Sequence, residues 1–113
     1  MTTRPWRQEI ELIQNYPKHK TFTMETSSNL AEDAIVISNF MEEANKVSFI
    51  VETNDAYIAF DEDADRDVTP KIGMLIPANE GYFDDSVYLG SKITIMCAAD
   101  GANARIRGII WGR

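Results

Sequence analysis

Residues 46–52 read Lys-Val-Ser-Phe-Ile-Val-Glu, and this stretch decides the fold class. Val47, Phe49 and Val51 recur at every second position, which places three apolar side chains on one face of an extended chain. The opposite face carries Lys46, Ser48 and Glu52. A period of two with one polar face predicts a half-buried β-strand.

The segments that follow continue as short strands separated by turn residues. Residues 53–55 (Thr-Asn-Asp) have turn chemistry, and residues 56–60 (Ala-Tyr-Ile-Ala-Phe) favour a strand, so a hairpin is expected to join residues 46–52 to residues 56–60. The remaining strands are predicted at residues 71–76, 81–88, 91–99 and 104–111. Seven or so short antiparallel strands predict an all-β fold, an antiparallel β-sandwich or jelly roll, over residues 34–113.

Two residues in the last strands bear on packing. Cys97 shares one strand face with Ile93 and Ile95 and is expected to be a small core residue. Gly108 interrupts the alternation between Ile106 and Trp111, which suggests a bulge or a close approach of another backbone.

Residues 1–33 are predicted to form an N-terminal arm, extended or partly helical, outside the sandwich. Trp6, Ile10 and Ile13 have the spacing of one helical face, although the same residues also fit an extended chain. The polar run at residues 26–29 is interpreted as a connection. Because so short a helix is marginal in water, we expect Trp6, Ile10 and Ile13 to be ordered by binding a partner.

The net charge of −7 is unevenly distributed. Residues 25–67 carry twelve acidic residues against Lys46 and Arg66, whereas residues 1–20 and 91–113 are net basic. The acidic segment would repel a polyanion, so nucleic acid is not an expected partner. No apolar run reaches the ~18 to 20 residues of a membrane span, so no membrane contact is expected either.

Motifs for catalysis or cofactor binding are missing from the sequence. One cysteine and one histidine, Cys97 and His19, provide neither a disulfide nor a common zinc site. Alternating acids at residues 61–67 begin like a calcium loop, but Arg66 stands where an EF-hand requires Gly, and Ile72 stands where it requires Glu. A solvated loop is therefore favoured over a cation site, and the protein is predicted to be non-enzymatic and without cofactors.

The strand aromatics allow two interpretations. They could line a carbohydrate-binding face, or they could fill the core and interfaces, which is the commoner use. They are Tyr57, Phe60, Tyr82, Phe83, Tyr88 and Trp111.

Residues 56–111 carry a series of short motifs in a fixed order. They are Ala-Tyr-Ile-Ala-Phe (56–60), Leu-Ile-Pro-Ala-Asn-Glu (75–80), Gly-Tyr-Phe (81–83), Leu-Gly-Ser-Lys-Ile-Thr (89–94) and a closing strand at 104–111. This order resembles small β-sandwich structural proteins of tailed bacteriophages and covers roughly half of the chain. The long N-terminal segment and the acidic run at residues 61–67 depart from the simpler members.

The resemblance implies a virion component that is assembled in the host cytoplasm. We expect a capsid decoration or cement subunit whose partners are the major capsid protein or other virion proteins. We also expect a homo-oligomer, a trimer or a dimer, because the sandwich has open sheet edges to protect and closed symmetry leaves no unpaired patch to polymerise. The alternative is a receptor- or carbohydrate-binding module of a phage head fibre or tail.

We expect chelation to leave the protein folded, because the acidic run fails the calcium template at Arg66 and Ile72. The melting temperature should be the same with EDTA as with added calcium, since a cation that binds only the folded state would raise it. A large fall in melting temperature on adding EDTA would show that a structural cation had been overlooked.

Overall fold

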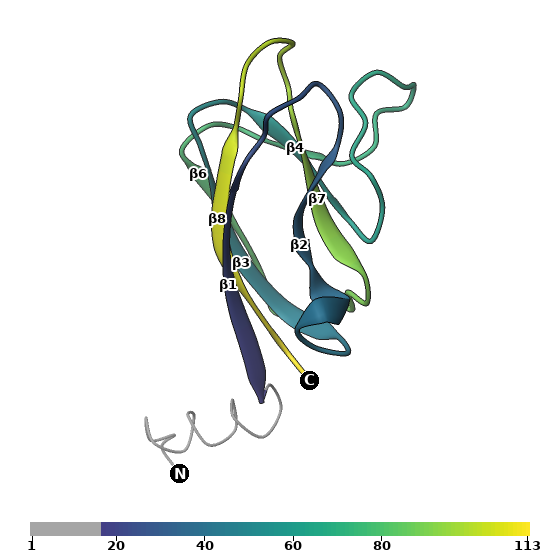
Figure 1. Cartoon of the computed structure of the whole chain (residues 1–113), viewed down its shortest axis with the longest axis vertical. Coiled ribbons are helices and arrows are strands. Elements are labelled where there is room, and N and C mark those ends of the chain that lie inside the picture. The colour runs from purple at the N-terminus through teal and green to yellow at the C-terminus, as the bar shows by residue number, and fades with distance from the viewer. Residues whose placement is uncertain (1–16) are drawn as a thin grey trace.

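The computed structural model describes residues 17–113, which form eight strands and one 3-10 helix (Figure 1). In chain order these are β1 (Lys18–Glu25), β2 (Glu32–Val36), η1 (Ile37–Asn39), β3 (Ala44–Glu52), β4 (Ala56–Phe60), β5 (Met74–Ile76), β6 (Glu80–Asp84), β7 (Lys92–Cys97) and β8 (Arg105–Gly112). Strands β3 and β4 match the predicted segments closely. Strand β6 is shorter than predicted because the Asp84 carboxylate accepts the Ser86 N–H and turns the chain.

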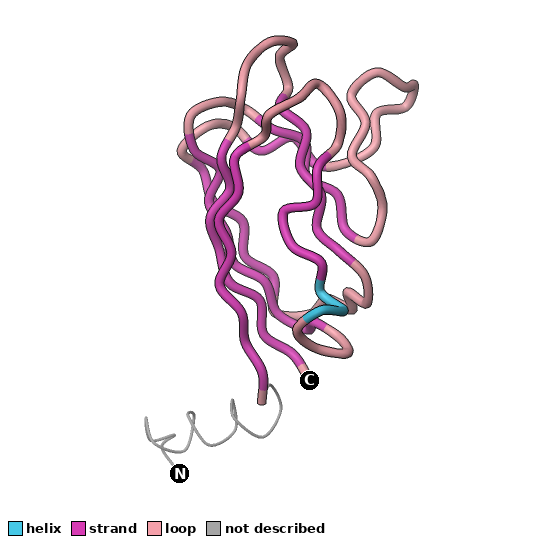
Figure 2. The backbone as a smooth tube through the Cα atoms, in the orientation of Figure 1, coloured by secondary structure: helices cyan, strands magenta, loops and turns pink. Residues whose placement is uncertain are grey.

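The strands form two four-stranded antiparallel sheets that pack face to face, as Figure 2 shows. Sheet A has the order β1-β8-β3-β6, and sheet B has the order β2-β7-β4-β5. Edge strand β1 contacts edge strand β2, and β6 contacts β5 on the opposite side. The prediction of an all-β antiparallel sandwich is therefore confirmed.

The predicted hairpin between β3 and β4 is wrong. Strand β3 belongs to sheet A and β4 to sheet B, so residues 53–55 cross from one sheet to the other. Thr53 has a positive φ of 75°, and the Asn54 side chain donates to the Asn103 carbonyl, which ties this crossing to the loop between β7 and β8. Both edges of β3 are already occupied by β8 and β6, so β4 has no place beside it.

The sandwich begins at Lys18, which corrects the boundary predicted at residue 34. Strand β1 pairs antiparallel with β8 over its whole length, from Lys18 opposite Gly112 to Glu25 opposite Arg105. Phe22 is buried in the core, so residues 18–25 belong to the sandwich and not to an arm. The predicted connection at residues 26–29 does link β1 to β2.

The core lies between the sheets and is built from the strand faces that the alternation predicted. Val47, Phe49 and Val51 of β3 face Ile93 and Ile95 of β7 across it, all 4% exposed or less. Cys97 is a buried free thiol in the same cluster, as predicted.

Gly108 marks a close approach of backbones, one of the two interpretations of its position. It lies in β8 opposite Phe22 of β1 on one side and Phe49 of β3 on the other. A Cβ atom at residue 108 would collide with the Ser48 carbonyl oxygen and would lie 2.6 Å from the Phe49 Cβ. The irregularity in the β3–β8 register lies elsewhere, between Ala44 and Lys46.

We expect Gly108→Ala to lower the free energy of unfolding by about 1–3 kcal/mol, because the added methyl group meets strand backbone that cannot move aside. Urea denaturation measures the change. Gly90→Ala is the matched control, since a Cβ at residue 90 has no neighbour within 4 Å. Equal stability of the two variants would contradict this account of the β8 packing.

Candidate functional site

Residues 61–73, here called the acidic lobe, connect β4 to β5 and lie against the outer face of sheet B. Asp61 begins the lobe in a left-handed conformation, with φ at 59°. Its carboxylate accepts three backbone N–H groups, from Gly90 at 3.0 Å, Ser91 at 2.8 Å and Lys92 at 3.1 Å. One carboxylate therefore joins the start of the lobe to the start of β7.

Thr94 in the middle of β7 fixes the next part of the lobe. Its hydroxyl accepts the Ala64 N–H at 3.0 Å and donates to the Glu62 carbonyl at 2.7 Å. Both Thr94 and Ala64 are buried. A buried hydroxyl that satisfies both backbone groups makes this contact specific.

Arg66 anchors the far end of the lobe and is only 8% exposed. Its guanidinium donates to the Cys97 carbonyl at 2.6 Å and pairs with the Asp100 carboxylate. Lys71 in turn donates to the Arg66 carbonyl at 2.5 Å. The planar, permanently charged guanidinium suits such a buried, multiply bonded position.

These contacts correct the expectation of a solvated loop. The lobe covers Thr94 and Met96, so β7 is buried on both of its faces. An antiparallel bridge between Asp65 and Ile72 closes the lobe on itself, which is why β5 begins only at Met74. The carboxylates of Glu62, Asp63 and Asp67 do remain exposed, as a solvated loop would have them.

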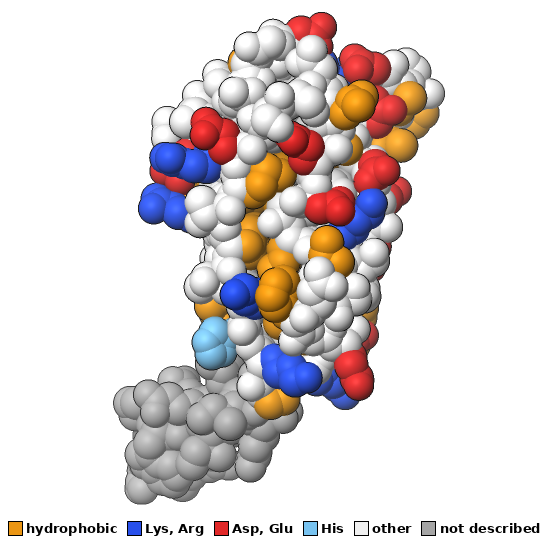
Figure 3. Space-filling view, in the orientation of Figure 1, with side chains coloured by type: hydrophobic (Ala, Val, Ile, Leu, Met, Phe, Trp, Pro, Cys, Tyr) orange, Lys and Arg blue, Asp and Glu red, His pale blue; other side chains and the backbone are white. Residues whose placement is uncertain are grey.

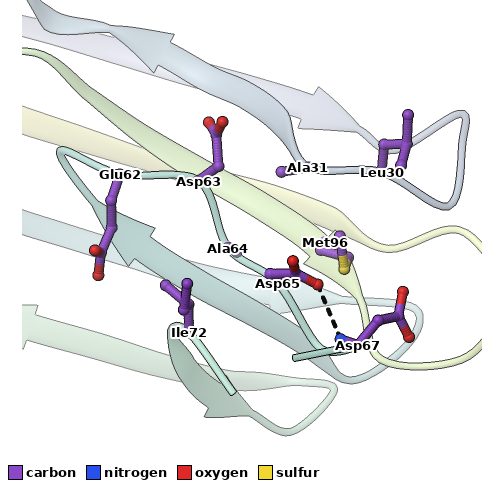
Figure 4. A pocket seen from close by; sticks show the side chains of 9 residues that line it. All are labelled: Leu30, Ala31, Glu62, Asp63, Ala64, Asp65, Asp67, Ile72 and Met96. Atoms are coloured by element: carbon purple, nitrogen blue, oxygen red, sulfur yellow. Dashed lines mark hydrogen bonds between the residues drawn. The ribbon is translucent and has the colours of Figure 1, made fainter. Parts of the chain in front are cut away.

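Between the lobe and the loop before β2 lies a groove of about 650 Å³ that is open to solvent, here called the acidic groove (Figure 4). Its lining combines apolar side chains with four carboxylates: Leu30, Ala31, Ala64, Ile72 and Met96, and Glu62, Asp63, Asp65 and Asp67. The Asp65 carboxylate accepts the Asp67 N–H at 2.9 Å, drawn as a dashed line in Figure 4. This arrangement suits a cationic group with an apolar neighbour.

Lys92 lies beside the groove and is paired with two acids. Its ammonium group is 2.6 Å from Asp63 and 3.7 Å from Asp33. The hydrogen bond that the Lys92 ammonium donates to the Asp63 carboxylate raises the pKa of Lys92 above its ordinary value. Lys92 therefore partly neutralises this side of sheet B over the whole physiological range of pH.

A second surface lies on the outer face of sheet A and is here called the cationic face. It consists of Lys46, Ile50, Phe83, Arg107, Ile109 and Trp111, brought together by the registers of β8, β3 and β6. The Lys46 ammonium lies 4.7 Å from the Trp111 ring centroid and 5.3 Å from that of Phe83. Both distances fit cation–π contacts.

Glu52 sits at one end of this face between two arginines. Its Oε1 atom is 3.0 Å from Nε of Arg107 and 3.4 Å from Nε of Arg105. Glu25 of β1 lies opposite Arg105 in the neighbouring register, so two carboxylates and two guanidinium groups share this end, and the net positive charge of the face comes from Lys46 on a chain whose net charge is −7. Figure 3 shows acidic side chains concentrated toward the lobe and sheet B. The two outer faces of the sandwich thus differ in charge.

The six strand aromatics do not form one platform. Phe60 and Tyr82 pack against the core, with Tyr82 5.4 Å from Phe49 and 5.9 Å from Phe60 between ring centroids. Burial raises the pKa of Tyr82, and its hydroxyl donates to Asp84. Tyr57 packs beneath the lobe, and Tyr88 lies in the loop after β6. Only Phe83 and Trp111 share a surface, the cationic face.

The predicted partner-binding residues Trp6, Ile10 and Ile13 lie outside the described residues. Within residues 17–113, no group of three or more His, Cys, Asp and Glu side chains could hold a metal ion. In the same part of the chain, no helix has the length and hydrophobicity of a membrane span. Comparison of the sequence with protein-family models and with curated proteins gave no match.

Sequence reasoning identified neither the anchoring role of Asp61 nor the cationic face. The face did leave a signal, because Arg107, Ile109 and Trp111 alternate with the core residues Ile106 and Ile110. A solvent-facing side that carries Ile and Trp is unusual for an antiparallel sandwich strand. The role of Asp61 left no such signal, since its partners are backbone groups.

We expect Asp61→Ala to destabilise the protein by about 2 kcal/mol, because three backbone N–H groups lose a charged acceptor. Chemical denaturation measures the loss. Glu62→Ala is the control, since Glu62 contributes its backbone carbonyl to Thr94 and its carboxylate is exposed. If both variants were as stable as the parent protein, the lobe would not be anchored through Asp61.

Proposed function

We propose that the protein is a non-enzymatic structural subunit of a tailed-phage virion, a decoration or cement protein that binds the assembled capsid. The observation that carries the proposal is the cationic face, an aromatic and basic surface on an acidic protein. Interfaces are enriched in Trp, Phe and Arg relative to the remaining surface. The phage assignment itself rests on the resemblance of residues 56–111.

The cationic face suits attachment better than solvent exposure. Phe83 is 58% exposed, and Ile50, Ile109 and Trp111 are half-buried around it. Burying such side chains against a partner contributes roughly 25 cal/mol per Å² of apolar area. Lys46 and Arg107 would meet acidic groups of the partner and orient the complex.

The mechanism is thermodynamic. A subunit that binds the assembled shell, and not its dissociated parts, stabilises the shell by mass action. Several copies linked as a homo-oligomer would bind more tightly than one, because later contacts form within a complex already held together. The major capsid protein is the proposed partner, and the subunit would join the virion in the host cytoplasm.

Co-sedimentation with capsids of the parent phage, prepared without this subunit, tests the proposal. We expect Phe83→Ala to weaken binding by about tenfold or more, since a central exposed aromatic has the properties of a binding hot spot. Tyr88→Ala is the matched control: Tyr88 is 78% exposed but lies in the loop between β6 and β7.

Two outcomes would contradict the proposal. If the parent protein failed to sediment with capsids, it would not be a decoration subunit. If it bound glycans saturably, and Phe83→Ala abolished that binding, the receptor- or carbohydrate-binding alternative would replace it. Circular dichroism of the variants ensures that lost binding is not lost folding.

A further inference from the structure

Among residues 17–113, strand β1 has the longest edge with which no other strand pairs. It forms one side of sheet A and spans eight residues, whereas β6 and β2 span five and β5 spans three. The other edges are also interrupted or charged: the register of β2 shifts between Asp33 and Ile35, and β6 carries Glu80 and Asp84. Natural sandwiches use such devices to prevent edge pairing. Strand β1 carries its charged residues Lys18, Lys20 and Glu25 toward its ends and its register with β8 is unbroken, so residues 21–24 form a regular, uncharged stretch of edge.

The hydrogen bonds at the end of β1 show which backbone groups face outward. The Thr26 N–H donates to the Ala104 carbonyl, in the same register that pairs Glu25 with Arg105. Hydrogen-bonded pairs alternate along an antiparallel ladder, so even-numbered residues of β1 bond to β8. The N–H and C=O groups of His19, Thr21, Thr23 and Glu25 therefore face the free edge.

We propose that β1 pairs antiparallel with β1 of a second copy, about a two-fold axis at Phe22, to make a continuous eight-stranded sheet. In this register His19 of one copy lies opposite Glu25 of the other, and Thr21 lies opposite Thr23. Each such pair exchanges two N–H···O bonds. The dimer forms between free subunits and does not depend on the proposed capsid function.

Charge and sequence select this orientation and register. Lys18 and Lys20 lie near one end of β1 and Glu25 at the other, so antiparallel pairing separates the lysines of the two copies and places Glu25 of each copy beside His19 of the other on the outer face of the sheet. Parallel pairing would align like charges. Shifting the register by one pair toward the N-terminus would place Pro17, which has no N–H, opposite Glu25 and lose a hydrogen bond.

The surroundings of β1 favour the same contact. In Figure 3 hydrophobic side chains form a column between the two sheets on the side where β1 and β2 meet. Phe22 and Met24 of β1 pack on the core at this edge. Two-fold pairing brings Phe22 of each copy together and extends the apolar surface across the junction, which adds cross-strand packing to the hydrogen bonds.

Sedimentation equilibrium of the full chain tests the dimer. We expect twice the monomer mass of 12.8 kDa at about 100 µM, the range suited to an interface of modest area. Thr23→Pro removes an outward N–H without touching the β8 ladder, so it should yield a folded monomer. Thr23→Val keeps the N–H and should remain dimeric.

Cross-linking tests the register independently of folding effects. His19→Cys and Glu25→Cys variants should form a disulfide-linked dimer when mixed under oxidising conditions, and neither should do so alone. The native Cys97 is 1% exposed and does not compete. A monomeric parent protein at ~100 µM, a Thr23→Pro variant that stays dimeric, or cross-linking of either variant by itself would overturn the proposal.

Discussion

Strand β8, at the C-terminal end of the described chain, pairs with β1 from its N-terminal end on one side and with β3 on the other. Sheet A therefore forms only when strands that are far apart in the sequence come together. Gly108 makes this possible, because any side chain there would enter the backbone of β3. Of the connections between strands, only the one from β4 to β5 stays within a sheet. Neither sheet can therefore form from neighbouring segments, and burial of the shared core holds both together.

The strands were predictable where one face meets the core and the other meets water. Residues 46–52 show this pattern because β3 is half-buried throughout. Strand β1 was missed because only Phe22 and Met24 mark its inner face, and an edge strand needs little more. The crossing at residues 53–55 could not be distinguished from a hairpin, since the same turn residues serve both and the true neighbours lie far away in the sequence.

The acidic lobe was harder to predict because its composition indicates solvent exposure. The lobe is held in place by hydrogen bonds from side chains to backbone groups. The Asp61 carboxylate accepts backbone N–H groups, and the Arg66 guanidinium donates to a backbone carbonyl of β7. Such contacts have no residue pattern of their own. As a result the chain covers the outer face of sheet B with its own lobe and leaves the outer face of sheet A uncovered by residues 17–113. This asymmetry supports the proposal that the protein attaches to a partner through the outer face of sheet A.

In this structure β1 is paired with β8 along one side and is unpaired within residues 17–113 along the other. Amide hydrogen exchange followed by NMR tests this arrangement most directly. At low concentration the amides of Lys20, Phe22 and Met24 should exchange slowly, because β8 accepts them, while those of Thr21 and Thr23 should exchange rapidly. At high concentration Thr21 and Thr23 should become protected as well. Rapid exchange at all five amides would show that β1 is not part of the sheet. Slow exchange at all five in dilute protein would show that the outer edge is already covered.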